Sequence, residues 1–210
     1  MKNFNLFIVF YFVATFISSG QDLPQEMWHP GIVVLDSQDT LRGNIQYDFE
    51  SNLVQFSGDK NRVRTFTSQN VLFFRFNCQY FNRPRTVYSI PYDLKGRMKV
   101  PVFFEILEEG YITFMTREYV VIDNNRFGNP MYRPSRSFGG REILTYDYFL
   151  LTNDGVIHKY SEKKKDLYSF FGVYKEQVEE FVKDRRLKTT KQGDLVTIMK
   201  YYNGLVSGRK

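Results

Sequence analysis

The spacing of the apolar residues changes once along this chain, at Ser161, and this change divides the sequence into two parts. Before it, apolar side chains recur every second residue in short runs bounded by Gly, Pro, Asn and Asp, which is typical of β-strands. After it, they recur at three- and four-residue spacings, which is typical of amphipathic helices. The sequence predicts an α+β fold: a β-rich body over 21–160, mainly antiparallel and rolled, barrel-like or sandwiched, then two or three helices over 161–210 packed on it.

The β pattern is clearest in the stretch 31–56. Leu41, Ile45 and Tyr47 lie on one face of a predicted strand. Gly43 stands where a fourth apolar side chain of that face would lie. Because a Gly inside a strand is typical of a bulge or of a close approach by another backbone, we expect such an approach at Gly43.

A hairpin is predicted around Asn153-Asp154-Gly155, between the strand runs 143–152 and 156–160. An Asp-Gly pair between two strands favours a tight hairpin, because the turn needs a residue with positive φ. The run 102–109 is ambiguous, since its short aromatic pattern fits either a strand or a short helix.

The C-terminal segment contains an apolar stripe over 194–205, formed by Leu195, Val196, Ile198, Met199, Tyr202 and Leu205. A helix of about twelve residues is only marginally stable alone, so this stripe has to be covered. The cover is the sheet of the same chain, which short connections favour, or a second protomer.

The first twenty residues have the pattern of a signal peptide. Lys2 precedes an apolar run over 4–17, and small residues follow at 18–20. The apolar run is shorter than the ~20 residues that a membrane-spanning helix needs. The sequence therefore predicts export to the periplasm or the extracellular space, with no transmembrane helix in the mature chain.

Charge is distributed unevenly along the chain. Residues 21–150 contain 15 Lys and Arg against 15 Asp and Glu, whereas residues 151–210 contain 13 against 8. The basic excess indicates an acidic envelope protein or an anionic envelope component as partner, and a solvated helix face is the simpler interpretation. Nucleic acid is not expected, because the chain is predicted to be exported and its aromatic residues have the spacing of a core.

Few residues suited to catalysis or metal binding are present. The chain has two histidines, His29 and His158, and one cysteine, Cys78. It contains no G-x-S-x-G, C-x-x-C, H-E-x-x-H, P-loop or G-x-G-x-x-G motif. We therefore predict no metal, no cofactor and no identifiable catalytic residue. Cys78 is expected to be a small buried apolar side chain.

Carboxylates offer one route to an enzyme. Glu105, Glu108 and Glu109 cluster in the ambiguous run; Glu105 and Glu108 share a face if it is a helix and lie on opposite faces if it is a strand. Two facing carboxylates can hydrolyse glycans. Solvated charges at the end of an element are the simpler interpretation.

Binding residues are suggested at two places. Asp147 lies among Tyr146, Tyr148 and Phe149, as an acid in a sugar-binding groove would, although it equally fits the outward position of an alternating strand. The longest irregular stretch is 123–141, and long loops in compact domains are often functional. Its candidate side chains are Arg126, Arg133, Arg136 and Arg141.

Two motifs carry a resemblance to known proteins. G-x-x-x-L-x-x-x-D-T-L-x-G-x-I at 31–45 and D-L-V-T-I-M-K-Y-Y-N at 194–203 resemble a group of uncharacterised secreted proteins of the Bacteroidota. The resemblance implies export and a β-rich body, and it supplies no catalytic residue. The prediction is an exported binding or structural module of the cell envelope that is not an enzyme. The alternatives are an envelope glycan hydrolase with paired carboxylates, or an adaptor that binds through its basic C-terminal helices.

Overall fold

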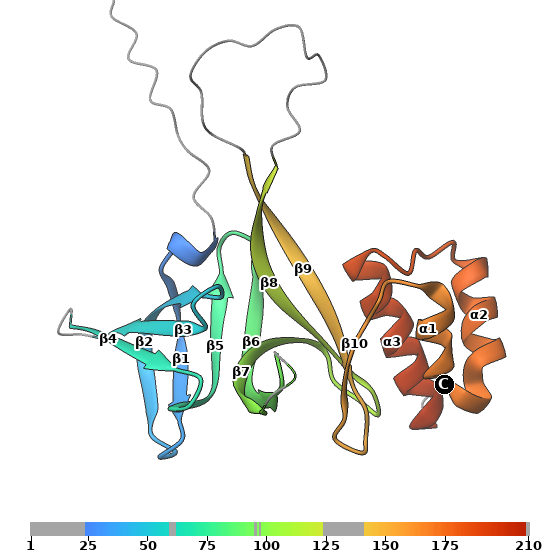
Figure 1. Cartoon of the computed structure of the whole chain (residues 1–210), viewed down its shortest axis with the longest axis horizontal. Helices are drawn as coiled ribbons and strands as arrows, with labels where there is room; N and C mark the ends of the chain where they lie inside the picture. Colours follow the sequence, from blue (N-terminus) through green and yellow to red (C-terminus); the bar gives the residue numbers. More distant parts are fainter. Residues whose placement is uncertain (1–23, 59–61, 95, 97, 124–140, 209–210) are drawn as a thin grey trace, which may run out of the picture.

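The described residues form one antiparallel sheet of ten strands followed by three α-helices, and the predicted α+β class is confirmed (Figure 1). The computed structural model describes residues 24–58, 62–94, 96, 98–123 and 141–208. The predicted signal peptide and residues 124–140 lie outside these ranges. Within them, no helix is long and apolar enough to cross a membrane.

The bounds of the elements are as follows. The strands are β1 (His29–Leu35), β2 (Thr40–Asp48), β3 (Leu53–Ser57), β4 (Val63–Thr67), β5 (Val71–Cys78), β6 (Arg83–Tyr92), β7 (Val100–Glu108), β8 (Thr113–Asp123), β9 (Arg141–Leu151) and β10 (Ile157–Lys159). The helices are α1 (Lys164–Ser169), α2 (Lys175–Asp184) and α3 (Gln192–Val206), with 3₁₀ turns η1 (Pro24–Glu26) and η2 (Gly172–Tyr174).

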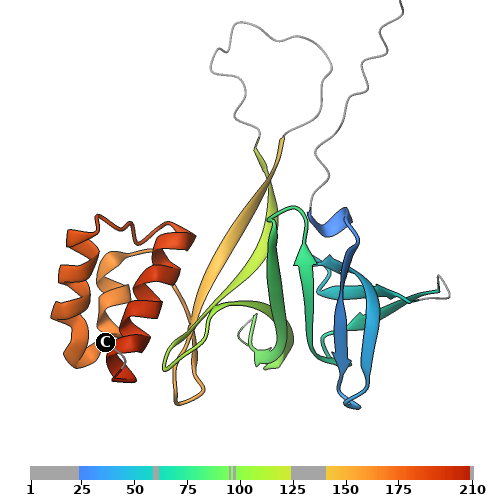
Figure 2. The same ribbon diagram turned by 180° about the vertical axis from the view of Figure 1, so that it is seen from behind.

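The strand order in the sheet is β10-β9-β8-β7-β6-β5-β1-β2-β3-β4. Most neighbours are consecutive hairpins, and the pairing of β1 with β5 is the exception. Strands β1 to β4 form one end of the molecule and the helices form the other, with the long β8–β9 hairpin between them (Figures 1 and 2). The predicted Asp-Gly hairpin joins β9 to β10, and Gly155 has a φ of 80°.

Two glycines allow the strands of the first hairpin to pack closely. Gly31 and Gly43 are paired across β1 and β2. A Cβ atom on Gly31 would lie 2.4 Å from the Arg75 carbonyl oxygen, and one on Gly43 would lie 2.4 Å from the Ser57 carbonyl oxygen. The predicted approach of another backbone at Gly43 is therefore confirmed, and no other residue fits at either position.

The sheet divides between β7 and β8. These strands pair only from Glu105 and Thr116 toward their connecting turn, while the rest of β8 pairs with β9 alone. The turn between β2 and β3 occupies the division. Its Asn52 Oδ1 accepts a hydrogen bond from the Phe103 backbone N–H (2.9 Å), and its Glu50 Oε1 accepts one from the Val120 N–H (3.3 Å). Side chains thus bind backbone donors that the ladder leaves free, and the sheet rolls onto itself.

Three buried apolar clusters result from this arrangement among the described residues. The first lies inside the rolled end and includes Val33, Ile45, Phe74, Val87 and Phe103. The second core lies between the strands β8 to β10 and the helices, and includes Phe114, Leu150, Leu167, Val178 and Ile198. The third contains Val102, Phe104, Met115 and Phe149 of β7, β8 and β9.

The stripe on α3 is covered by the same chain. Leu195, Ile198 and Met199 are fully buried, and Tyr202 is 4% exposed. Their neighbours in the second core come from β8, β9, α1 and α2. The sequence left open whether the same chain or a second protomer covers this stripe. The structure shows that the sheet and helices of the same chain cover it.

The run 102–109, which by sequence fits either a strand or a short helix, lies almost entirely in strand β7. Strand β5 buries one face, whereas Leu72 on its other face is 45% exposed, because one face of a rolled single layer meets solvent. Cys78 is buried, as predicted.

Strand β6 extends through two prolines, Pro84 and Pro91. Its partner β5 pairs with 83–88 and its partner β7 pairs with 87–92. Each proline therefore lies where β6 has a neighbour on one side only. A strand tolerates Pro at such an edge position, since no ladder hydrogen bond is lost there. The extension places Arg85 inside the sheet.

Candidate functional site

Asp147 is an outward residue of β9. Its carboxylate Oδ2 lies 2.7 Å from the Lys159 Nζ of β10, and both side chains are partly exposed. This is the alternating-strand interpretation rather than the sugar groove. Arg126, Arg133 and Arg136 lie outside the described residues. Arg141 begins β9, but its side chain is not described.

Glu105 is buried, not solvated, and belongs to an ion-pair cluster at the division of the sheet. The Arg85 Nη2 atom lies 2.7 Å from Glu105 Oε2 and 2.6 Å from Glu118 Oε2, and these side chains are only 1–2% exposed. Arg83 Nη1 approaches Glu105 Oε1 to 2.5 Å from the partly exposed side. The Arg85 guanidinium also lies over the rings of Phe76 and Phe81. Two arginines thus neutralise two carboxylates.

The charges in this cluster affect one another's ionisation. Burial by itself would lower the pKa of Arg85, but the charges of Glu105 and Glu118 more than offset it and raise that pKa. Burial raises the pKa of Glu118, and Arg85 offsets this effect in part. Because Arg85 remains charged, the cluster links three strands, β6, β7 and β8, at the division and does not present a free acid or base.

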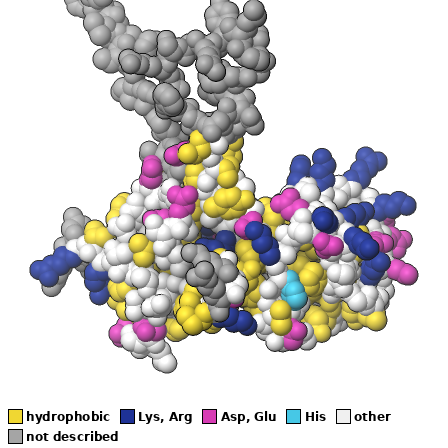
Figure 3. Space-filling view, in the orientation of Figure 1, with side chains coloured by type: hydrophobic (Ala, Val, Ile, Leu, Met, Phe, Trp, Pro, Cys, Tyr) yellow, Lys and Arg dark blue, Asp and Glu magenta, His cyan; other side chains and the backbone are white. Residues whose placement is uncertain are grey.

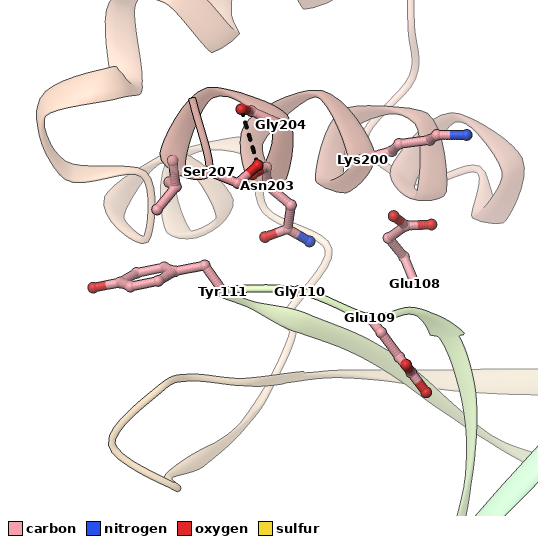
Figure 4. Close-up of a pocket in the computed structure, with 9 residues that line it drawn as sticks. Glu108, Glu109, Gly110, Tyr111, Lys200, Asn203, Gly204 and Ser207 are labelled. Carbon is pink, nitrogen blue, oxygen red and sulfur yellow. Dashed lines mark hydrogen bonds between the residues drawn. The ribbon is translucent and has the colours of Figure 1, made fainter. Parts of the chain in front are cut away.

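A cleft of about 640 Å³ lies where the β7–β8 turn meets α3 (Figure 4). Asn203 of α3 closes its floor: its Oδ1 accepts a hydrogen bond from the Ile112 N–H (3.0 Å), and its Nδ2 donates one to the Ile112 carbonyl (2.9 Å). Gly110 makes this contact possible, since a Cβ there would lie 2.2 Å from Asn203 Nδ2. The helix is thereby attached to the sheet through a backbone pair.

The two carboxylates beside this cleft do not face each other. Glu108 points toward Lys200 of α3, whereas Glu109 points away from the helix (Figure 4). Burial raises the pKa of Glu108; Lys200 lowers it and the neighbouring charge of Glu109 raises it further. The cleft therefore holds one acid opposite one amine, which is not the paired-carboxylate arrangement of a glycan hydrolase.

We expect Glu108→Gln to stabilise the protein at pH 7. The folded-state pKa of Glu108 is raised above its ordinary value of 4.5, so ionisation costs more in the folded than in the unfolded chain. The gain from the neutral side chain should be present above the raised pKa and should vanish as the pH falls below the ordinary value. Urea unfolding of both proteins at pH 7 and at about pH 4 measures it. Glu109→Gln is the control, and an equal gain at both pH values would contradict the assignment.

On the face that Figure 3 shows, Lys and Arg side chains gather over the helices. The end of α2 and its connection to α3, residues 183–191, contain five exposed basic side chains and one exposed acid. The basic residues are Lys183, Arg185, Arg186, Lys188 and Lys191. A separate groove of about 370 Å³ lies between α1 and α2 and is lined by Lys164, Lys165, Tyr168, Lys175 and Glu179.

No protein-family model matches the chain, and no curated protein or solved structure is significantly similar to it. The resemblance to secreted proteins of the Bacteroidota therefore stays a prediction. Among the described residues, no three His, Cys, Asp or Glu side chains gather as metal ligands do.

Sequence reasoning missed Arg85, Glu118 and Tyr168. Arg85 alternates with the buried Val87, and Glu118 alternates with the buried Thr116, so each charge falls on the inward face of its strand. Opposite charges at inward positions of two strands are a signal of a buried pair. The signal could not be used without knowing that β6 and β8 approach each other.

Proposed function

We propose that this protein is an exported binding module of the cell envelope that is not an enzyme, and that its helical layer contacts an anionic envelope component. The observation that carries this proposal is the excess of exposed cations over 183–191, on helices held to the sheet by a buried core. A docked layer keeps these charges in a fixed arrangement. Such a surface attracts anionic partners and raises their rate of association.

The positions and ion pairs of the carboxylates support the proposal that the protein is not an enzyme. Glu105 is neutralised by two arginines, Asp147 by Lys159, and Glu108 and Glu109 point in different directions. The glycan-hydrolase alternative would need two of these acids on opposite sides of one substrate. It remains an outcome of the experiment below.

The proposal is tested by cosedimentation of the mature chain, residues 21–210, with an isolated envelope fraction. We expect binding at about 50 mM salt and release at about 500 mM, because exposed charges are screened over that range. The variant Lys183→Glu/Lys188→Glu should lose binding. Its matched control is Arg42→Glu/Arg62→Glu, which changes the net charge equally on exposed side chains of the β-rich body.

Two results would overturn the proposal. One is binding that neither salt nor the Lys183/Lys188 variant weakens. The other is release of soluble sugar fragments from the envelope fraction, which would favour the hydrolase alternative. Equal loss of binding in both charge variants would show attraction by net charge alone and would remove the role assigned to the helical layer.

A further inference from the structure

The groove between α1 and α2 is lined in part by Tyr168, whose buried hydroxyl has no hydrogen-bond partner among the described residues. Tyr168 of α1 is 4% exposed, and its hydroxyl oxygen makes no hydrogen bond to any described residue. Tyr168 lines the groove together with Lys175 and Glu179 of α2. Burial raises the pKa of Tyr168, and the nearby charges of Glu179 and Tyr160 raise it further. A buried hydroxyl without a hydrogen-bond partner destabilises the fold, because it has lost its hydrogen bonds to water. The Tyr168 hydroxyl is therefore either an uncompensated polar group or a donor for a bound ligand.

The walls of the groove favour an anion. Lys164, Lys165 and Lys175 supply three positive charges, and Glu179 supplies one negative charge. Lys175 and Glu179 are 4.0 Å apart and about half exposed, so this pair neutralises Lys175 only weakly. The Lys164 ammonium lies over the Tyr168 ring, 5.3 Å from its centroid. Because a lysine carries its charge on a flexible stem, Lys164 can swing aside and uncover the floor of the groove.

We propose that the α1–α2 groove binds a phosphate or sulfate group, which accepts a hydrogen bond from the Tyr168 hydroxyl and is held by Lys164, Lys165 and Lys175. An oxyanion has several acceptor oxygens and requires both a donor and positive charge, which this groove provides together. The inference deepens the proposed function and rests on it only for the source of the group. A free oxyanion and a phospholipid headgroup offer the same chemistry.

The test compares two tyrosines that are equally buried. Tyr168→Phe removes an unpaired hydroxyl, whereas Tyr160→Phe removes a hydroxyl that donates to the Thr189 carbonyl at 3.0 Å. Inorganic phosphate and sulfate are titrated into the mature chain by NMR, with melting curves recorded with and without anion. We expect Tyr168→Phe to melt no lower than the wild type without anion and to bind phosphate about tenfold or more weakly. Tyr160→Phe should melt lower and bind normally.

A second arm identifies the source. Vesicles with and without phosphatidylglycerol are mixed with the wild type, Tyr168→Phe and Lys164→Gln/Lys165→Gln. If Tyr168→Phe and Lys164→Gln/Lys165→Gln both lose binding to phosphate or to vesicles, the result supports an anion site in the α1–α2 groove. Anion or vesicle binding that Tyr168→Phe leaves unchanged would overturn the inference, as would the absence of both. If the groove fails this test but the 183–191 surface still binds the envelope fraction, the proposed function stands without this site. If the groove binds phosphate but the protein does not bind the envelope fraction, the anion site stands and the proposed function fails.

Discussion

Arg85→Met is expected to lower the free energy of unfolding by about 3–5 kcal/mol, which is the cost of breaking a buried ion pair by removing one partner. The variant keeps an unbranched apolar stem but removes the guanidinium, whose Nη2 lies 2.7 Å from Glu105 and 2.6 Å from Glu118. Both carboxylates are only about 2% exposed, so water cannot replace the guanidinium. Arg83 reaches Glu105 alone, and Glu118 is left without a cation.

The pH dependence of this variant identifies the cause. In the variant, Glu118 is buried without a contacting cation, and this raises the folded-state pKa of its carboxyl further above the unfolded value. The ionised Glu118 carboxylate then destabilises the fold at neutral pH, and the penalty disappears as the pH falls through the raised pKa toward the ordinary one. Arg85→Met should therefore regain stability relative to the wild type between about pH 7 and pH 4, as measured by urea unfolding at each pH.

Two controls separate charge from packing. Arg42→Met makes the same substitution at an exposed position of β2 and should change stability by no more than about 0.5 kcal/mol. The triple variant Arg85→Met/Glu105→Gln/Glu118→Gln removes the charges on both sides and should recover a large part of the loss. A cost below about 1 kcal/mol for Arg85→Met would show that the cluster is not a structural centre of the fold.

Truncation before Lys191 is expected to be the other large effect, lowering the melting temperature of the mature chain by at least about 10 °C. It removes α3, whose Leu195, Ile198, Met199 and Tyr202 are buried in the core between sheet and helices. Burial of four such side chains stabilises a fold by roughly 6–12 kcal/mol, which is comparable to the whole stability of a typical domain. The truncation also exposes the apolar faces of α1, α2 and β8.

Point variants give a graded form of the same experiment. Ile198→Ala should cost about 2–5 kcal/mol, because it leaves a cavity at a fully buried position. Val173→Ala is the matched control, since Val173 is 91% exposed. If the truncated chain melts as the full chain does and loses only a partner, α3 is an interaction segment and the adaptor alternative gains support.

The sequence alone predicts the fold class and the boundary between sheet and helices, because both follow from local periodicity. Alternation by two and spacing by three or four residues are properties of a strand and a helix by themselves. The same holds for the Asp-Gly hairpin, for the stripe on α3 and for Gly43, each of which obeys a rule that acts over a few residues. Local rules do not state which elements meet.

Only the tertiary structure decides the site. The β2–β3 turn enters the division between β7 and β8, and β6 contacts β8 through Arg85 and Glu118. Each of these contacts is between residues more than thirty positions apart in the sequence. Glu105 is indistinguishable in sequence from the solvated Glu109, yet one is buried between arginines and the other faces away from the helix. A charge is buried or solvated according to what packs against it, and that is settled by the folded chain as a whole.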